Sequence, residues 1–287
     1  MKILTNTTAD GVKLEAIFDP DKGLNLTSFT KGGIEAIDPK THPLFDERCA
    51  GLGALIGPHF HHRRKEDIPP LKDPNLFPHT AKILASGSSE PFSHGIARYV
   101  PWNVKQENNV LKGNLSGHDT YKGHPLKELE GQDFAMFFKA SLEPDGLYIE
   151  LSVESERPSV VGFHYYYNLY GDEAAFVEAS VAKDYRANQG WSPLPSTWEK
   201  EGKLHFSLDQ ESDFGFLPED KSRSGHIVLK TKKYEQHVSY EAGQDDHSWQ
   251  LYHPEKASFA CIEPLSAKEP RNPVLTSSSL KVKLEIR

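Results

Sequence analysis

Cysteine is scarce in this 287-residue sequence: Cys49 and Cys261 are the only two, and neither has a CxxC partner. Their scarcity excludes a disulfide framework and a zinc ribbon, and isolated thiols fit a reducing compartment. The sequence also lacks the run of roughly 20 apolar residues that a membrane span needs, and its N-terminus lacks the apolar stretch of a signal peptide. We therefore expect a cytoplasmic protein that has no membrane partner.

Positive charge is also in short supply, because 33 Lys and Arg face 41 Asp and Glu, which gives a formal net charge of −8. Nucleic acid is not an expected partner, since binding to phosphates requires a basic surface. Hydrophobic residues make up 37% and charged residues 26% of the chain, as in globular proteins. With no composition break and no repeat, we expect one domain over residues 1–287, as a monomer or homodimer.

No segment keeps an amphipathic helical pattern over four turns, and the clearest periodicity is two. Leu147, Ile149, Leu151 and Val153 share one face of a predicted strand, and residues 280–286 repeat the pattern. The alternation predicts an all-β fold, a large antiparallel β-sandwich with few short helices. Further predicted strands cover residues 12–18, 24–29, 110–116, 134–142, 160–169, 204–208, 227–231, 249–252 and 258–262.

One segment, residues 65–79, carries four prolines and is expected to be irregular. Loops of this length without secondary structure are uncommon in compact domains and often line functional sites. We therefore expect this loop to line a site.

A first polar motif lies in residues 92–102, where His94-Gly95 is followed by Arg98 and Trp102. The histidine and arginine offer hydrogen-bond donors, and the tryptophan offers a flat apolar platform, which together suit a sugar. Taken alone, the motif is explained more simply by a partly buried loop histidine and a surface arginine.

Two further motifs lie on predicted strands. Alternation places His164, Tyr166 and Asn168 on one face of their strand. Glu263 ends an apolar strand and is followed by Pro264, so we expect its carboxylate at the rim of a sheet, where desolvation would raise its pKa. Taken separately, His164 fits a satisfied core histidine and Glu263 a solvent-facing charge.

Together the three motifs resemble those of the aldose 1-epimerase family, the galactose mutarotases and their relatives, which read HGxxRxxxW, a histidine before a tyrosine-rich NL segment, and a late CxEP. The order and wide spacing match, and residues 269–273 are similar to the segment that trails the family's glutamate. The resemblance implies a galactose mutarotase-like sandwich with a sugar cleft across one sheet. It also implies that His164 is the general acid, that Glu263 is the general base, and that His94 and Arg98 hold the sugar.

That chemistry interconverts the α and β anomers of an aldohexose by opening the ring, and needs one acid and one base but no metal or other cofactor. Many relatives also carry an arginine after a Gly-Pro-rich strand, which we place at Arg63 or Arg64. Asp213 is our candidate for an aspartate that contacts sugar hydroxyls in some relatives.

Three alternatives remain. His59, His61 and His62 suggest a metal, but no carboxylate or cysteine at a ligand spacing completes the site, so we expect none. Arginines suit phosphate, so residues 63–65 with Arg98 could make the substrate a hexose 6-phosphate. The third is a non-catalytic carbohydrate-binding protein, which would not need both an acid and a base.

Overall fold

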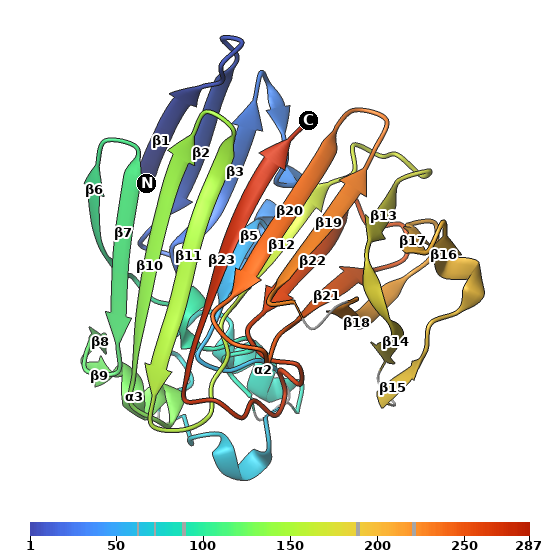
Figure 1. Ribbon diagram of the computed structural model, residues 1–287. Helices are drawn as coiled ribbons and strands as arrows, with labels where there is room; N and C mark the ends of the chain where they lie inside the picture. Colours follow the sequence, from blue (N-terminus) through green and yellow to red (C-terminus); the bar gives the residue numbers. More distant parts are fainter. Residues whose placement is uncertain (62, 72, 88–89, 188–189, 220–221) are drawn as a thin grey trace.

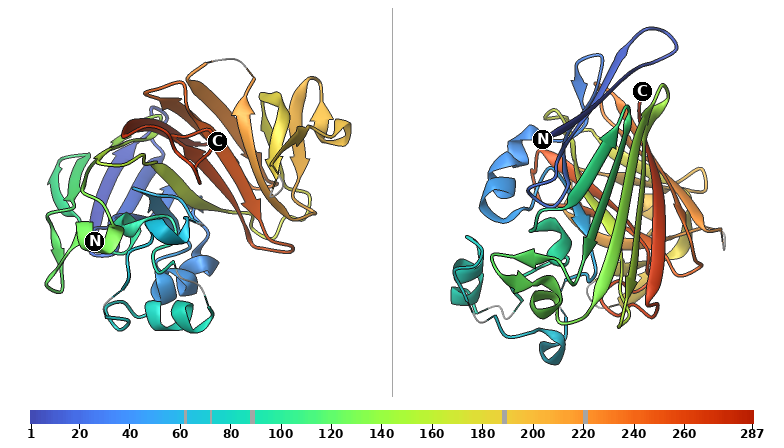
Figure 2. Two further views of the ribbon diagram at one scale, coloured as in Figure 1. Left: turned by 90° about the horizontal axis from the view of Figure 1, so that it is seen from below. Right: turned by 90° about the vertical axis from the view of Figure 1, so that its left-hand side faces the viewer.

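The chain forms two large antiparallel β-sheets stacked face to face, as Figures 1 and 2 show for the computed structural model. The structure describes residues 1–61, 63–71, 73–87, 90–187, 190–219 and 222–287. The predicted all-β sandwich with few short helices is confirmed. Each predicted strand coincides with an observed one, although other strands, among them the eight-residue strand Glu235–Ala242, were not predicted.

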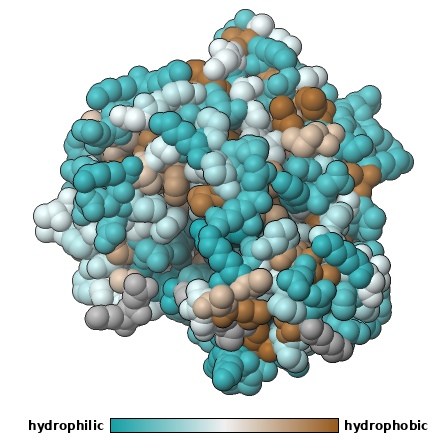
Figure 3. All heavy atoms as spheres, turned by 180° about the vertical axis from the view of Figure 1, so that it is seen from behind, coloured by the Kyte–Doolittle hydropathy of each residue, from teal (hydrophilic) through white to brown (hydrophobic). Residues whose placement is uncertain are grey.

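The sheet at the back of Figure 1 has eleven strands among the described residues, in the order β1-β2-β3-β5-β12-β22-β21-β18-β14-β15, with β4 beside β3. Its outer face, seen from behind in Figure 3, is mostly hydrophilic. The strands are β1 Lys2–Thr7, β2 Lys13–Asp19, β3 Asn25–Lys31, β4 Ile34–Glu35, β5 Gly53–Ile56, β12 Gly162–Asn168, β14 Val181–Ala187, β15 Gly190–Pro193, β18 Ser212–Pro218, β21 Ser248–His253 and β22 Phe259–Leu265.

The sheet at the front has ten strands in the described ranges, in the order β16-β17-β13-β19-β20-β23-β11-β10-β7-β6, and β8 and β9 form a separate hairpin. The strands are β6 Asn103–Glu107, β7 Val110–Ser116, β8 Thr120–Tyr121, β9 His124–Pro125, β10 Phe134–Glu143, β11 Gly146–Ser155, β13 Phe176–Ala179, β16 Glu199–Lys200, β17 Lys203–Ser207, β19 Ser224–Lys230, β20 Glu235–Ala242 and β23 Ser277–Ile286.

The core lies between the two sheets because alternating residues of each strand point inward. On β11 the predicted apolar face is fully buried, with Leu147, Ile149, Leu151 and Val153 at most 1% exposed. Burying one such aliphatic side chain contributes about 1.5–3 kcal/mol, so the alternation strongly favours closing the sandwich. The other face of each sheet is left available for polar side chains.

The few helices are short. They are α1 His42–Arg48, α2 Thr80–Ala85, α3 Leu126–Glu130 and the 3₁₀ turns Pro39–Thr41, Lys65–Asp67, Ile96–Arg98 and Ser196–Trp198. No helix in the described ranges is long and apolar enough to cross a membrane. The proline-rich segment 65–79 contains only one 3₁₀ turn where it is described, as predicted for an irregular loop.

Candidate active site

A cavity of about 230 Å³ lies over adjacent strands of the eleven-stranded sheet. Strands β12, β22, β21 and β18 lie side by side and contribute His164, Glu263, Gln250 and Asp213 to it. We call this cavity the catalytic pocket. The structure therefore brings together five of the site residues predicted from the sequence. They are His164, Glu263 and Asp213 from the strands, His94 from a loop, and Arg98 from a 3₁₀ turn.

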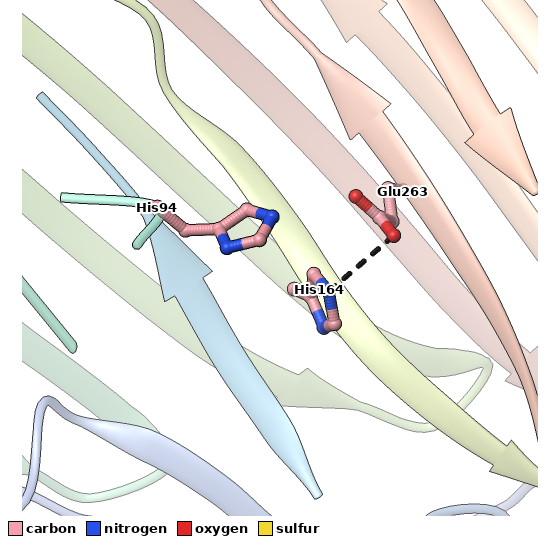
Figure 4. A group of neighbouring side chains, drawn as sticks. All are labelled: His94, His164 and Glu263. Atoms are coloured by element: carbon pink, nitrogen blue, oxygen red, sulfur yellow. Dashed lines mark ion pairs between the residues drawn. The ribbon is translucent and has the colours of Figure 1, made fainter. Parts of the chain in front are cut away.

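The strand register places His164 opposite Glu263. Tyr165 of β12 pairs with Ile262 of β22 in antiparallel register, so His164, which precedes Tyr165, lies across from Glu263, which follows Ile262. Both side chains alternate to the face opposite Tyr165 and Ile262, which is the pocket face. Nε2 of His164 and Oε1 of Glu263 are 3.5 Å apart, and Figure 4 shows the two side chains facing each other. An acid and a base are thus within reach of one small ligand.

Glu263 does not lie at the rim of the sheet as predicted. Strand β22 continues through Pro264, which pairs with Trp249 of β21, so the carboxylate is in the interior of the sheet and 1% exposed. This correction strengthens the predicted effect, because deeper burial raises the pKa further. Burial raises the pKa of Glu263 to about 8, which the nearby Asp213 carboxylate increases and the Arg98 guanidinium opposes.

The two histidines shift in the other direction. Burial lowers the pKa of His164 and of His94 well below the usual value, since each charged imidazolium would lose its hydration. The charge of Arg98 adds to this effect at both rings. At neutral pH the pair of His164 and Glu263 therefore holds one proton between them.

His94 reaches the pocket because its backbone takes an unusual conformation. Its φ is +69° and that of Gly95 is +87°, and a Cβ on Gly95 would lie 1.9 Å from the carbonyl oxygen of Gly57. The glycine of the His-Gly motif is thus sterically required. The His94 ring meets His164 edge to face, with ring centroids 4.8 Å apart, and stacks on His61 at 5.0 Å.

Arg98 ends a 3₁₀ turn and is only 4% exposed. Its Nε and Nη1 atoms, and Oε2 of Glu263, are buried without a hydrogen-bond partner among the described residues. A buried polar group without a partner costs about 1–3 kcal/mol, so the site is built to hold a ligand that supplies donors and acceptors.

Gln250 belongs to the site but was not predicted. Its Nε2 donates to Oδ1 of Asp213 at 2.6 Å, and its Oε1 accepts from Nη2 of Arg186 at 3.1 Å. This chain of contacts fixes the Asp213 carboxylate at the pocket wall. Gln250 lies between Trp249 and Leu251 on β21, and both of these neighbours are buried in the core. Strand alternation could therefore have placed Gln250 on the opposite face, which is the pocket face.

Trp102 and the predicted arginine do not lie in the catalytic pocket. Trp102 is 4% exposed in the core, where its Nε1 donates to the carbonyl of Ala97 at 2.8 Å. Arg63 turns toward Glu90, and Arg63 and Arg64 line a neighbouring cavity instead. The structure corrects these predictions: an intramolecular acceptor holds the tryptophan, and a buried carboxylate holds Arg63.

Arg48, which was not predicted, also lines the pocket. It is the last residue of the short helix α1, after which Cys49 takes a left-handed conformation with φ of +51°. No local pattern in the sequence marks Arg48, because its position depends on how α1 packs beside the sheet.

Of the three histidines that suggested a metal, His62 lies outside the described residues and His61 stacks on His94. His59 bonds Glu130 through Nδ1 at 2.5 Å and the carbonyl of Phe92 through Nε2 at 2.7 Å, so neither nitrogen is available.

Three groups in the pocket could approach a cation. His94, His164 and Glu263 offer ligand atoms that all lie within 4.8 Å of one another. The buried Arg98 guanidinium lines the same pocket and disfavours a second positive charge. The trio therefore suits proton transfer to a neutral ligand better than cation binding.

Comparison with solved structures places the fold among galactose mutarotase-like proteins. A galactose mutarotase-like protein from Lactobacillus casei ATCC 334 aligns over 100% of both chains, with a TM-score of 0.67 and 14% identity. A protein from Escherichia coli K12, provisionally named an aldose 1-epimerase, aligns with a TM-score of 0.66 and 14% identity, over 100% of this chain and 99% of its own. The Slr1438 protein from Synechocystis sp. PCC 6803 aligns with a TM-score of 0.66 and 19% identity, over 100% of this chain and 96% of its own.

No family model matches the sequence, and no curated protein matches it. The fold implied by the sequence motifs is therefore confirmed by structure alone, at identities too low to transfer an activity. The function has to be argued from the pocket itself.

Proposed function

We propose that the protein is an aldose 1-epimerase, a mutarotase that interconverts the α and β anomers of an aldohexose. The observation that carries the proposal is the pairing of His164 with Glu263 across adjacent strands, 3.5 Å apart and buried. The pocket of about 230 Å³ suits one small sugar.

In the proposed reaction Glu263, as the general base, takes the proton from the anomeric hydroxyl, and the electron pair of the broken O–H bond forms the aldehyde C=O. The bond between C1 and the ring oxygen breaks, and His164 delivers a proton to that oxygen. Rotation about C1–C2 and the reverse proton transfers then close the ring as the other anomer. Protons and electrons balance without a cofactor, and Arg98 and His94 offer donors to the sugar oxygens.

Mutarotation is favoured over simple sugar binding by the acid–base pair. Sugar binding alone needs neither an acid nor a base, whereas His164 and Glu263 lie 3.5 Å apart and burial raises the pKa of Glu263 to about 8. Perturbed groups of this kind are typical of catalytic sites. Among the described similar structures, the provisional name of the Escherichia coli protein supports the same proposal. A cytoplasmic location and a monomeric or homodimeric state stay predictions.

The proposal is tested by following the anomerisation of freshly dissolved α-D-glucose, α-D-galactose and glucose 6-phosphate by polarimetry, with the spontaneous rate subtracted. Wild type should accelerate at least one sugar, and Glu263→Gln should lose most of that acceleration. Glu150→Gln is the matched control, since this carboxylate lies on β11 and is 50% exposed. Binding without acceleration for all three sugars would reject catalysis and leave the carbohydrate-binding alternative.

Acceleration confined to glucose 6-phosphate would favour the hexose-phosphate alternative. The specific observation behind that alternative is the pair of arginines, Arg48 and Arg98, that line the pocket.

A further inference from the structure

A second cavity, of about 350 Å³, adjoins the catalytic pocket. His61 lines both, and its ring stacks on His94 at 5.0 Å. The sequence has only nine arginines, yet four of them line this one cavity and no lysine does. We call it the arginine cavity; its arginines are Arg63, Arg64, Arg157 and Arg271.

Two carboxylates also line the arginine cavity, and both are already paired. Glu130 is 1% exposed and is bonded to His59, with Nη1 of Arg63 3.6 Å away. Asp67 lies 3.7 Å from Arg157. Two of the four arginines thus have local partners.

Arg64 and Arg271 have no ion-pair partner in the part of the chain that the structure describes, and both are exposed. The cavity therefore carries excess positive charge in a protein whose net charge is −8. A local cluster of positive charge in a protein of negative net charge favours the binding of an anion at that place.

Arg63 is held in place before any ligand arrives. Its Nε donates to Glu90 at 3.0 Å and its Nη1 donates to the carbonyl of Glu130 at 2.8 Å, while its Nη2 has no partner among the described residues. The guanidinium fork matches carboxylate, sulfate and phosphate geometry, and a fixed fork loses little entropy on binding.

We propose that the arginine cavity binds the anionic substituent of a saccharide whose reducing-end ring occupies the catalytic pocket. The inference rests on the proposed function for the position of that ring, and it assigns the substrate class as acidic sugars. Because His61 lines both, the pocket and the cavity are neighbours, and the proposed saccharide would span the two. Carboxylate, sulfate and phosphate share the chemistry that the arginines recognise.

The first test measures anion binding without any sugar. Sulfate is titrated by calorimetry into wild type, into the double variant Arg64→Gln/Arg271→Gln and into the control Arg223→Gln. Arg223 is an exposed arginine outside the cavity, paired with Asp245. Because each lost arginine contact is exposed, we expect the sulfate Kd to rise about tenfold in the double variant and to stay unchanged in the control.

The second test compares the binding of D-glucuronate and glucose 6-phosphate with that of D-glucose. Wild type should bind at least one acidic sugar about tenfold more tightly than glucose, and the double variant should lose this preference while its affinity for glucose is unchanged. Sulfate should compete with the acidic sugar. The sugar that shows the preference distinguishes a carboxylate from a phosphate substituent.

Equal binding of acidic and neutral sugars to wild type, or a preference that survives in the double variant, would overturn the proposal. Sulfate binding that does not compete with the acidic sugar would also overturn it, because the cavity would then hold a separate anion. Both tests measure binding and not turnover. If the protein binds acidic sugars through these arginines but accelerates the anomerisation of none, the proposed function is refuted and the binding proposal stands.

Discussion

The proposed mutarotase activity should depend on a single proton that His164 and Glu263 share. Catalysis requires Glu263 without a proton and His164 with one, whereas burial favours the reverse arrangement, a neutral ring beside a protonated carboxyl. The two arrangements hold the same number of protons, and the two atoms that exchange the proton are 3.5 Å apart. Their ratio is therefore independent of pH, and activity follows the population of the pair that holds one proton.

The magnitude follows from the pKa of about 8 that burial gives Glu263. If the pair loses its shared proton with this pKa, it keeps the proton in about 90% of molecules at pH 7, in about half at pH 8 and in about 10% at pH 9. We expect kcat/KM to fall about tenfold from pH 7 to pH 9. A second fall should begin only well below pH 6.5, because the pKa of His164 is lowered well below its usual value and the pair then gains a second proton.

The profile is measured as kcat/KM for an accepted aldohexose from pH 5 to pH 10, with the spontaneous rate subtracted at each pH. A rate that rises through pH 8 and stays high at pH 10 would refute the reasoning. Such a rise would mean that ionisation of Glu263 alone limits the reaction and that His164 does not deliver the proton.

Three further predictions concern Asp213 in the pocket, Trp102 in the core and His59 beside the arginine cavity. Asp213→Asn should move the alkaline fall of the kcat/KM profile to lower pH, because the Asp213 carboxylate raises the pKa of Glu263. Trp102→Phe should lower the free energy of unfolding in urea by about 1 kcal/mol through one lost hydrogen bond but leave KM unchanged, whereas a changed KM would return this ring to the pocket. Burial lowers the pKa of His59 but Glu130 raises it overall, so this pKa should fall in Glu130→Gln when it is followed by NMR. In wild type the stability gained from protonated His59 is present below the pKa of an unfolded histidine and should be lost as pH rises through the raised pKa, whereas a pH-independent stability would contradict this.

Most of the sandwich could be predicted because strand alternation is a local property of the sequence. Residues 147–153 and 280–286 show it clearly, and both lie in long strands of the front sheet. Strand β20 was missed because Gln236 and His237 are buried within it and conceal the apolar alternation. The short strands β13 and β14 have equally weak patterns.

The site could be predicted in part, because His94, His164 and Glu263 each stand in a recognisable local motif. Arg48 could not, since its position depends on the packing of α1, and Trp102 stands in a motif yet faces the core. The depth of Glu263 was misjudged because proline usually ends a central strand, and here β22 continues through it. Local patterns thus identify residue types, while tertiary packing decides which of them share a pocket.

The central claim, that His164 and Glu263 work as one acid–base unit, is tested most directly by the residual rates of His164→Asn, Glu263→Gln and the double variant. The α-to-β exchange rate of an accepted sugar is measured at equilibrium by NMR, with folding checked by circular dichroism. Each single variant should lose about 10²- to 10⁴-fold, and the double variant should lose little more, because partners of one unit are not additive. Losses that multiply in the double variant, or a wild-type rate in either single variant, would contradict the account.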